Sequence, residues 1–190
     1  MRRGRGTRAA WTGILLTLVV ACGGDGGEAG TDAGSGEAFV PPRDADVLLA
    51  DLHWETSGPP AIGAPVNLTQ RPGYDNQPHF VPDGSGLWYT AVDDQSGQSD
   101  IWRVDFADRR VARVTMSAPE SEYSATPLPD GSGISTIRVE ADSTQRLWRF
   151  DTDGANGSVV FEEIAPVGYH KWADENTVVM FVLGSPATLQ

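Results

Sequence analysis

The side chains that most often carry out catalysis are few and scattered in this chain of 190 residues. Its three histidines, His53, His79 and His170, lie too far apart in sequence to form the closely spaced pair of a zinc site. No serine lies in a Gly-x-Ser-x-Gly motif, and the single cysteine, Cys22, lies near the N-terminus. We therefore expect a protein that has no catalysis of its own and needs no cofactor.

The segment "DTDGANG", residues 151–157, is a candidate for metal binding. Asp151 and Asp153 have the spacing of two calcium ligands in a loop. However, Gly154 stands at position four of the segment rather than six, and Ala155 offers no ligand at position five. We predict a turn here and keep a metal site at Asp151 and Asp153 as the weaker alternative.

The sequence contains an internal repeat, and this repeat predicts the strands that would position any functional site. The five residues 82–86, Pro-Asp-Gly-Ser-Gly, return 47 positions later as residues 129–133, and Trp102 returns after 46 positions as Trp148. A weaker third copy places Asp174 44 residues after Asp130. Short β-type runs surround each copy, and about four strands per 45 residues is the period of a propeller blade. The predicted class is all-β, with blades of four antiparallel strands.

The repeated residues have a physical role in such a blade. Proline fixes one dihedral angle of a tight turn, aspartate can accept a hydrogen bond from the backbone beyond it, and glycine takes the positive φ that other residues resist. Each Pro-Asp-Gly therefore marks a hairpin between the first two strands of a blade. Trp102 and Trp148 lie on the third strand, where we expect them to pack between neighbouring blades.

These motifs resemble a known family. Leu68-Thr69, "YDNQPHFVPDG", the paired Pro-Asp-Gly turns and "DIWRVD" are similar to the TolB-type six-bladed propeller repeats of exported bacterial proteins, relatives of the WD repeats. The resemblance covers residues 46 to 183. It implies a protein-binding platform or, as the alternative, the propeller portion of a hydrolase or peptidase whose catalytic domain is absent from this chain.

The sequence divides into a predicted signal peptide (1–21), a lipid-anchored flexible linker (22–45) and a partial TolB-like propeller of about three blades (46–190). The blades are expected at the four ranges 46–69, 77–115, 124–164 and 168–183. Only the middle two are whole, because the first lacks its first two strands and the last lacks its final two. Two explanations remain open: the chain is a piece of a longer six-bladed protein, or two copies join head to tail into one ring. Left uncovered, the run from Val178 to Leu183 would be an exposed apolar edge.

The N-terminus has the layout of an export signal. Four arginines precede the apolar run 14–20, and residues 19–22, Val-Val-Ala-Cys, resemble a bacterial lipobox. This pattern predicts a lipid on Cys22, and hence membrane attachment, with a plain signal peptide as the alternative. The residue after the lipidated cysteine is Gly23 and not aspartate. By resemblance to known sorting behaviour, this favours the outer membrane if the cell has two membranes, with the protein on the periplasmic or surface side.

The charge of the chain excludes some partners. The formal net charge is -12, and removing residues 1–21 takes away four arginines and no acids, so the mature chain carries -16. Such a surface argues against nucleic acid and against electrostatic attachment to anionic lipid. A protein or a small polar ligand is the expected partner.

Candidate binding residues lie on one predicted rim and near the central channel. Asp93 and Asp94, and their counterparts Asp142 and Gln145, lie in polar loops between second and third strands. His79 and His170 lie on predicted innermost strands, where they would either face the channel or pack between strands. His170 comes two residues before Trp172.

Overall fold

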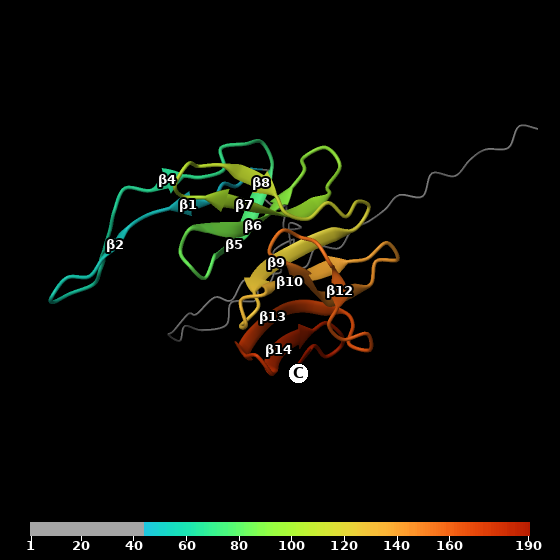
Figure 1. The fold of residues 1–190 in the computed structure, drawn as a ribbon. Coiled ribbons are helices and arrows are strands. Elements are labelled where there is room, and N and C mark those ends of the chain that lie inside the picture. The colour runs from blue at the N-terminus through green and yellow to red at the C-terminus, as the bar shows by residue number, and fades with distance from the viewer. Residues whose placement is uncertain (1–43) are drawn as a thin grey trace, which may run out of the picture. The chain divides into compact units, whose positions relative to one another are not determined.

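The computed structural model describes residues 44–190, and in this range every regular element is a β-strand (Figure 1). The all-β class predicted from the sequence is confirmed. Within this range the structure contains no helix with the length and hydrophobicity needed to cross a membrane. The predictions of a lipid on Cys22 and of a signal peptide concern residues outside the described range.

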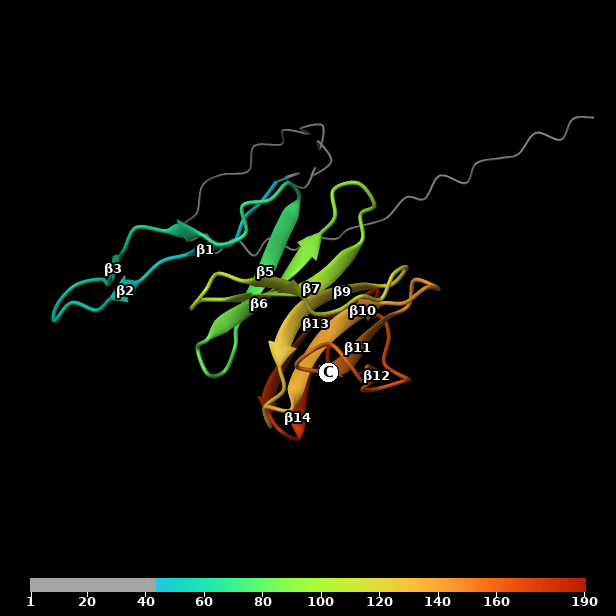
Figure 2. The ribbon, with the colours of Figure 1, turned by 45° about the horizontal axis from the view of Figure 1, so that its top comes forward.

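Two complete blades form the middle of the chain, each a four-stranded antiparallel sheet whose strands follow one another in sequence order. Blade 1 consists of β5 (Tyr74–Phe80), β6 (Gly86–Val92), β7 (Ser99–Asp105) and β8 (Val111–Arg113). Blade 2 consists of β9 (Ser121–Pro127), β10 (Gly133–Val139), β11 (Gln145–Asp151) and β12 (Ser158–Val159). The strands of blades 2 and 3 run beside one another in Figure 2.

Incomplete sheets flank these two blades. Blade 3 consists of β13 (Val167–Asp174), β14 (Thr177–Val182) and the short β15 (Thr188–Leu189). β15 was not expected from the sequence. At the other end, β1 (Leu48–Leu49) pairs with β4 (Val66–Asn67), and this pair is called the half-blade below. A finger formed by β2 (Leu52–His53) and β3 (Ala61–Ile62) extends from the half-blade.

Equivalent hydrogen bonds show which strands the half-blade contains. In blades 1 and 2 the residue after the fourth strand donates its N–H to a carbonyl of the third strand: Val114 to Ile101 at 2.7 Å and Val160 to Leu147 at 2.8 Å. Leu68 donates in the same way to Val47 at 2.9 Å. β1 and β4 are therefore a third and a fourth strand. The bonded residues are 21 positions apart in the half-blade and 13 apart in both whole blades, and the eight extra residues lie in the finger.

The repeated Pro-Asp-Gly-Ser-Gly motif forms the same turn in both whole blades. Gly84 and Gly131 adopt φ of 72° and 73°, where a side chain would be strained. Asp83 accepts a hydrogen bond from the N–H of Ser85 at 2.9 Å. Gly86 is required for a different reason, because a Cβ there would collide with the carbonyl oxygen of Val104 on the third strand.

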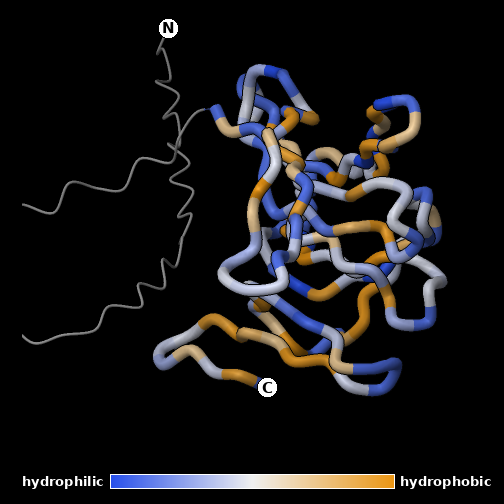
Figure 3. Tube along the Cα trace, turned by 90° about the vertical axis from the view of Figure 1, so that its left-hand side faces the viewer, coloured by the Kyte–Doolittle hydropathy of each residue, from blue (hydrophilic) through white to orange (hydrophobic). Residues whose placement is uncertain are grey.

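Hydrophobic cores lie between consecutive sheets, as expected for blades that cannot be stable alone. The core between blades 1 and 2 contains Trp88 and Phe150, and Trp148 packs against it. Trp102 packs against the core between the half-blade and blade 1. Both tryptophans thus lie between neighbouring sheets, as predicted. Figure 3 shows hydrophobic stretches along the trace, and hydrophilic residues at several of the bends where the trace reverses direction.

Candidate functional site

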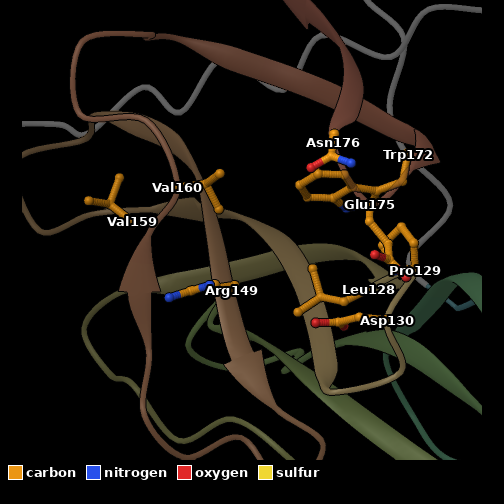
Figure 4. A pocket seen from close by; sticks show the side chains of 9 residues that line it. All are labelled: Leu128, Pro129, Asp130, Arg149, Val159, Val160, Trp172, Glu175 and Asn176. Carbon is orange, nitrogen blue, oxygen red and sulfur yellow. The ribbon is translucent and has the colours of Figure 1, made fainter.

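A cavity of about 450 Å³ opens between blades 2 and 3 (Figure 4). It lies at the end of the sheets where the first strand of each blade turns into the second. Its lining consists of Leu128, Pro129, Asp130, Arg149, Val159, Val160, Trp172, Glu175 and Asn176. The corresponding space between blades 1 and 2 holds the ring of Phe150, which packs with Val81 and Val114, the counterparts of Leu128 and Val160. Between blades 2 and 3, the residues that blade 3 contributes to the lining are Trp172, Glu175 and Asn176.

The cavity combines apolar walls with a polar rim. Leu128 and Val160 come from blade 2, and the indole of Trp172 faces them from blade 3. On the rim, the Arg149 Nε donates to Ser158 Oγ at 3.1 Å, and the guanidinium is otherwise exposed. The Asp130 carboxylate is held by the Ser132 N–H and hydroxyl, which lower its pKa. This arrangement suits an apolar or aromatic group that carries polar atoms at its outer edge.

Ser135 of blade 2 fixes the orientation of the Trp172 indole. The Nε1–H of Trp172 donates to Ser135 Oγ at 2.8 Å, and His170 Nε2 lies 2.7 Å from the same oxygen. Ser135 pairs with Thr126 across the hairpin as Trp88 pairs with His79, so Ser135 is the counterpart of Trp88. Because the serine is small, blade 3 can insert its own large side chains at this position.

The Ser135 and His170 pair does not have the surroundings of a catalytic nucleophile. Ser135 is fully buried, and His170 Nδ1 has no hydrogen-bonding partner among the described residues. A serine nucleophile needs access to substrate and a base that a third group orients. Burial lowers the pKa of His170 to about 4, and the charges of Lys171 and His79 add to this effect. The pair therefore acts as a packing contact.

The two candidate channel histidines face different surroundings. His170 packs against blade 2, whereas His79 Nδ1 lies 3.1 Å from the carbonyl oxygen of Phe80 in its own strand. The strand pairing explains the difference. His79 of blade 1 corresponds to Lys171 of blade 3, so His170 is one residue out of register with it and points to the other side of its strand.

The predicted loop residues lie at the opposite end of the sheets from the cavity, because connections between antiparallel strands alternate between ends. Asp93 accepts hydrogen bonds from the Ser96 hydroxyl and N–H, both at 2.7 Å, and these lower its pKa. Asp142 accepts from the Thr144 N–H at 2.9 Å. Asp94 is exposed, and Gln145 begins β11. The carboxylates of Asp93 and Asp142 thus stabilise their own turns.

The weaker metal candidate also lies in a turn. Asp151 accepts a hydrogen bond from the side-chain amide of Asn156 at 2.6 Å, and Asp153 accepts from the Ala155 N–H at 3.0 Å. Between residues 44 and 190 the structure brings together no group of three or more side chains able to hold a metal ion.

The junction between blades 1 and 2, unlike the cavity junction between blades 2 and 3, contains a buried pair of charged side chains. Glu122 of β9 is fully buried, and Arg138 Nε lies 3.4 Å from its carboxylate. Burial raises the pKa of Glu122, while hydrogen bonds from Ser117 and Thr115 lower it in part. The Arg138 guanidinium also lies over the Trp148 ring, 4.4 Å from its centroid. Arg138 also forms an ion pair with Glu120, so its guanidinium lies between two carboxylates.

Comparisons with known proteins agree with this fold. An uncharacterized protein of Agrobacterium fabrum, Atu1656, is 28% identical over 107 residues, which are 53% of this chain and 36% of the relative. A crystal structure of TolB from Acinetobacter baumannii matches with a TM-score of 0.54 at 19% identity, over 75% of this chain and 36% of the other. A protein assigned as TolB from Agrobacterium tumefaciens matches with a TM-score of 0.46 at 28% identity, over 52% and 37% of the two chains.

No family model matches the chain. The chain spans little more than a third of the length of the proteins that it matches. The likeness to the Acinetobacter structure confirms the TolB-type propeller fold that the repeat motifs predicted. Sequence reasoning did not find the cavity, whose lining residues carry no motif apart from the Pro-Asp-Gly turn at residues 129–131.

Proposed function

We propose that this TolB-type propeller chain is a non-catalytic binding platform of the cell envelope, exported and lipid-anchored at Cys22. In this proposal a partner protein inserts an apolar or aromatic side chain into the cavity between blades 2 and 3. The cavity is the observation that carries the proposal, since its volume of about 450 Å³ lies within the range of roughly 300–1,000 Å³ typical of ligand sites.

The lining of the cavity supports a protein partner. Buried aromatic anchors contribute most of the energy of many protein interfaces, and the Trp172 indole with Leu128 and Val160 offers an apolar surface for one. The mature chain carries a net charge of -16, which favours a partner with basic residues around its anchor because opposite charges speed the encounter. Arg149 on the rim would then accept a polar group next to the anchor.

The surroundings of Ser135 and His170 support the absence of catalysis. This is the one serine and histidine pair within hydrogen-bonding distance among residues 44–190, and its hydroxyl is fully buried. The cavity presents Asp130 and Glu175 as carboxylates, but the Asp130 carboxylate is occupied by its own turn.

Site-specific photo-cross-linking in the cells that make the protein tests this proposal. A photoreactive side chain replaces Asn176, which is exposed on the rim, and a control replaces Gln95, which is exposed at the opposite end of the sheets. We expect a discrete adduct from position 176 only. A second change, Val159→Phe, fills the cavity and should remove that adduct. The same adducts from both positions, or an adduct insensitive to Val159→Phe, would contradict the proposal.

The anchor is tested separately by replacing Cys22 with serine. If Cys22 carries the lipid, the Cys22→Ser protein should leave the membrane fraction and appear in the soluble fraction. Retention of the variant in membranes would show that another element attaches the chain.

A further inference from the structure

The turn between the third and the fourth strand of blade 2 contains the dipeptide Asn156-Gly157, and both residues are exposed. A glycine after an asparagine leaves its own backbone nitrogen unshielded, because no Cβ lies beside it. That nitrogen can approach the side-chain carbonyl carbon of the asparagine. The other three asparagines of the chain are followed by residues with larger side chains, leucine, glutamine and threonine, at Asn67, Asn76 and Asn176.

The N–H of Gly157 is free. Ser158 pairs with Arg149, and the N–H of Val160 donates to a carbonyl of β11, so the alternating ladder turns the Gly157 N–H away from β11. Among residues 44–190 this N–H has no hydrogen-bond acceptor. The glycines of the Asp-Gly turns differ, because their N–H groups donate to backbone carbonyls at 2.8, 2.9 and 2.9 Å in Gly84, Gly131 and Gly154.

The packing of blade 2 requires the glycine of this dipeptide. A Cβ on Gly157 would lie 2.5 Å from a carbon of the Phe150 ring, which fills the junction between blades 1 and 2. In blade 1 the counterparts of Gly157 and Phe150 are Val111 and Val104, which pair with each other, and the smaller Val104 leaves room for a side chain. The ring that closes the first junction therefore fixes glycine after Asn156.

Asn156 itself supports the end of the third strand. Its side-chain amide donates to Asp151 at 2.6 Å, and in blade 1 the guanidinium of Arg110 donates to Asp105 at 3.4 Å, again across five residues. Arg110 is 71% exposed although blade 1 packs against a sheet on each side. The exposure of this turn position therefore does not depend on how much of the next blade is present.

We propose that Asn156 is a site of spontaneous deamidation. The backbone nitrogen of Gly157 attacks Cγ of Asn156, so that an N–Cγ bond forms and the Cγ–Nδ2 bond breaks. The amide proton of Gly157 passes to solvent, and the side-chain nitrogen takes up a proton and leaves as ammonia. Water then opens the cyclic imide at either of its two carbonyl carbons, which gives aspartate or isoaspartate at position 156.

The product weakens the turn in two ways. A carboxylate replaces the amide donor beside Asp151, so two negative charges face each other where a hydrogen bond existed. Isoaspartate also adds one carbon to the backbone directly before Gly157, which packs against Phe150. Through this ring the change reaches the junction between blades 1 and 2. Asn156 does not line the cavity between blades 2 and 3, so the reaction is independent of the proposed binding function.

Peptide mass mapping of the full chain, kept folded at pH 8 and sampled over time, tests the reaction. Trypsin cleaves after Arg149 and Lys171, so Asn156 and the exposed Asn176 fall into separate peptides, 150–171 and 172–190. We expect the first peptide to show the mass change from amide to acid, and to split into aspartate and isoaspartate forms, at least tenfold faster than the second. An unchanged position 156, or equal rates in the two peptides, would overturn the proposal.

Two variants test the structural consequence. Asn156→Asp carries the aspartate product from the start and should unfold at a lower urea concentration than freshly prepared protein. Asn156→Arg is the matched control, because it introduces the residue that blade 1 has at this position, Arg110. It should unfold where the fresh protein does and should keep its mass at position 156. Equal unfolding midpoints for the two variants would contradict the effect on the turn.

Discussion

The junction between blades 1 and 2 and the junction between blades 2 and 3 bring together the same faces of successive repeats, yet equivalent positions in them hold different side chains. At one second-strand position of the first junction the earlier blade provides the large side chain, since Trp88 is buried beside Ala125 and Ile134. At the second, the counterpart of Trp88 is Ser135, and the later blade provides Trp172 instead. The first junction is closed, whereas the second retains the cavity.

This difference shows that equivalent strand positions in successive blades can exchange which blade supplies the large side chain. A large side chain at one position of the second strand excludes a large one on the facing strand, and a small one admits it. The first junction adds the buried Glu122 and Arg138 pair, while the second relies on the hydroxyl of Ser135. We therefore expect the first junction to contribute more to stability and the second more to binding.

The largest effect should come from Trp88→Ala. Removing an indole that is 1% exposed leaves a cavity in the first junction, and such truncations cost about 3–5 kcal/mol. The free energy of unfolding in urea measures the change. Trp54→Ala is the control, because Trp54 is 78% exposed and should change stability by less than about 0.5 kcal/mol. If both variants lose a similar free energy of unfolding, Trp88 does not contribute to stability through burial in the first junction.

The next largest effect should come from Arg138→Met, which removes the guanidinium that pairs with Glu120 and lies 3.4 Å from the buried Glu122 carboxylate. Breaking a buried ion pair costs about 3 kcal/mol or more. Because burial already raises the pKa of Glu122, the penalty should shrink as the pH falls and the carboxyl group becomes neutral. Urea unfolding at pH 8 and pH 5 tests both points. Arg110→Met should have little effect at either pH, since Arg110 is 71% exposed, and a pH-independent loss would contradict the role of Glu122.

At the second junction, Ser135→Ala should cost about 2 kcal/mol, because the Trp172 Nε1–H and the His170 ring lose their partner while they remain partly buried. The fluorescence emission of Trp172 should also change in the Ser135→Ala variant, because its indole loses a hydrogen bond. Ser132→Ala removes an exposed hydroxyl and serves as the control. An unchanged free energy of unfolding would mean that the second junction does not depend on this hydroxyl.

The smallest effect should be the pH dependence contributed by His170. Its pKa is about 4 in the folded protein and 6.5 in the unfolded chain, so the unfolded state binds the proton more readily between these values. The stability that the neutral ring provides is full above about pH 6.5 and is lost as the pH falls towards 4. We expect His170→Gln to remove about 1 kcal/mol of the difference in unfolding free energy between pH 7 and pH 5.5. His53→Gln, at an exposed position, should leave the profile unchanged.

The fold could be predicted because its signals are local. The Pro-Asp-Gly-Ser-Gly turn requires a positive φ at Gly84 and a close approach at Gly86, and both requirements fall within five residues. The positions of Trp102 and Trp148 between sheets could also be predicted, because side chains alternate between the two faces of a strand and this signal is local too. β15 was missed because a strand of two residues has no readable period.

The cavity could not be predicted because it depends on contacts between repeats. Trp172 and Ser135 are 37 residues apart, and their meeting depends on the register of the hairpin in blade 3. The rim residues Asp93 and Asp142 show a second limit of sequence reasoning. Their polar character pointed to ligand binding, but each carboxylate is used by the turn in which it lies. An acidic side chain in a loop is therefore weak evidence for a site until its own backbone bonds are known.

The finger formed by β2 and β3 has a practical consequence. It extends away from the blades in Figure 1, and its Trp54 and Ile62 are 78% and 75% exposed and belong to none of the hydrophobic cores. Residues at its tip therefore provide an attachment point for a fluorophore or an epitope tag that leaves every blade undisturbed. A probe placed there would report the position of the protein in a living cell without touching the cavity assigned to binding.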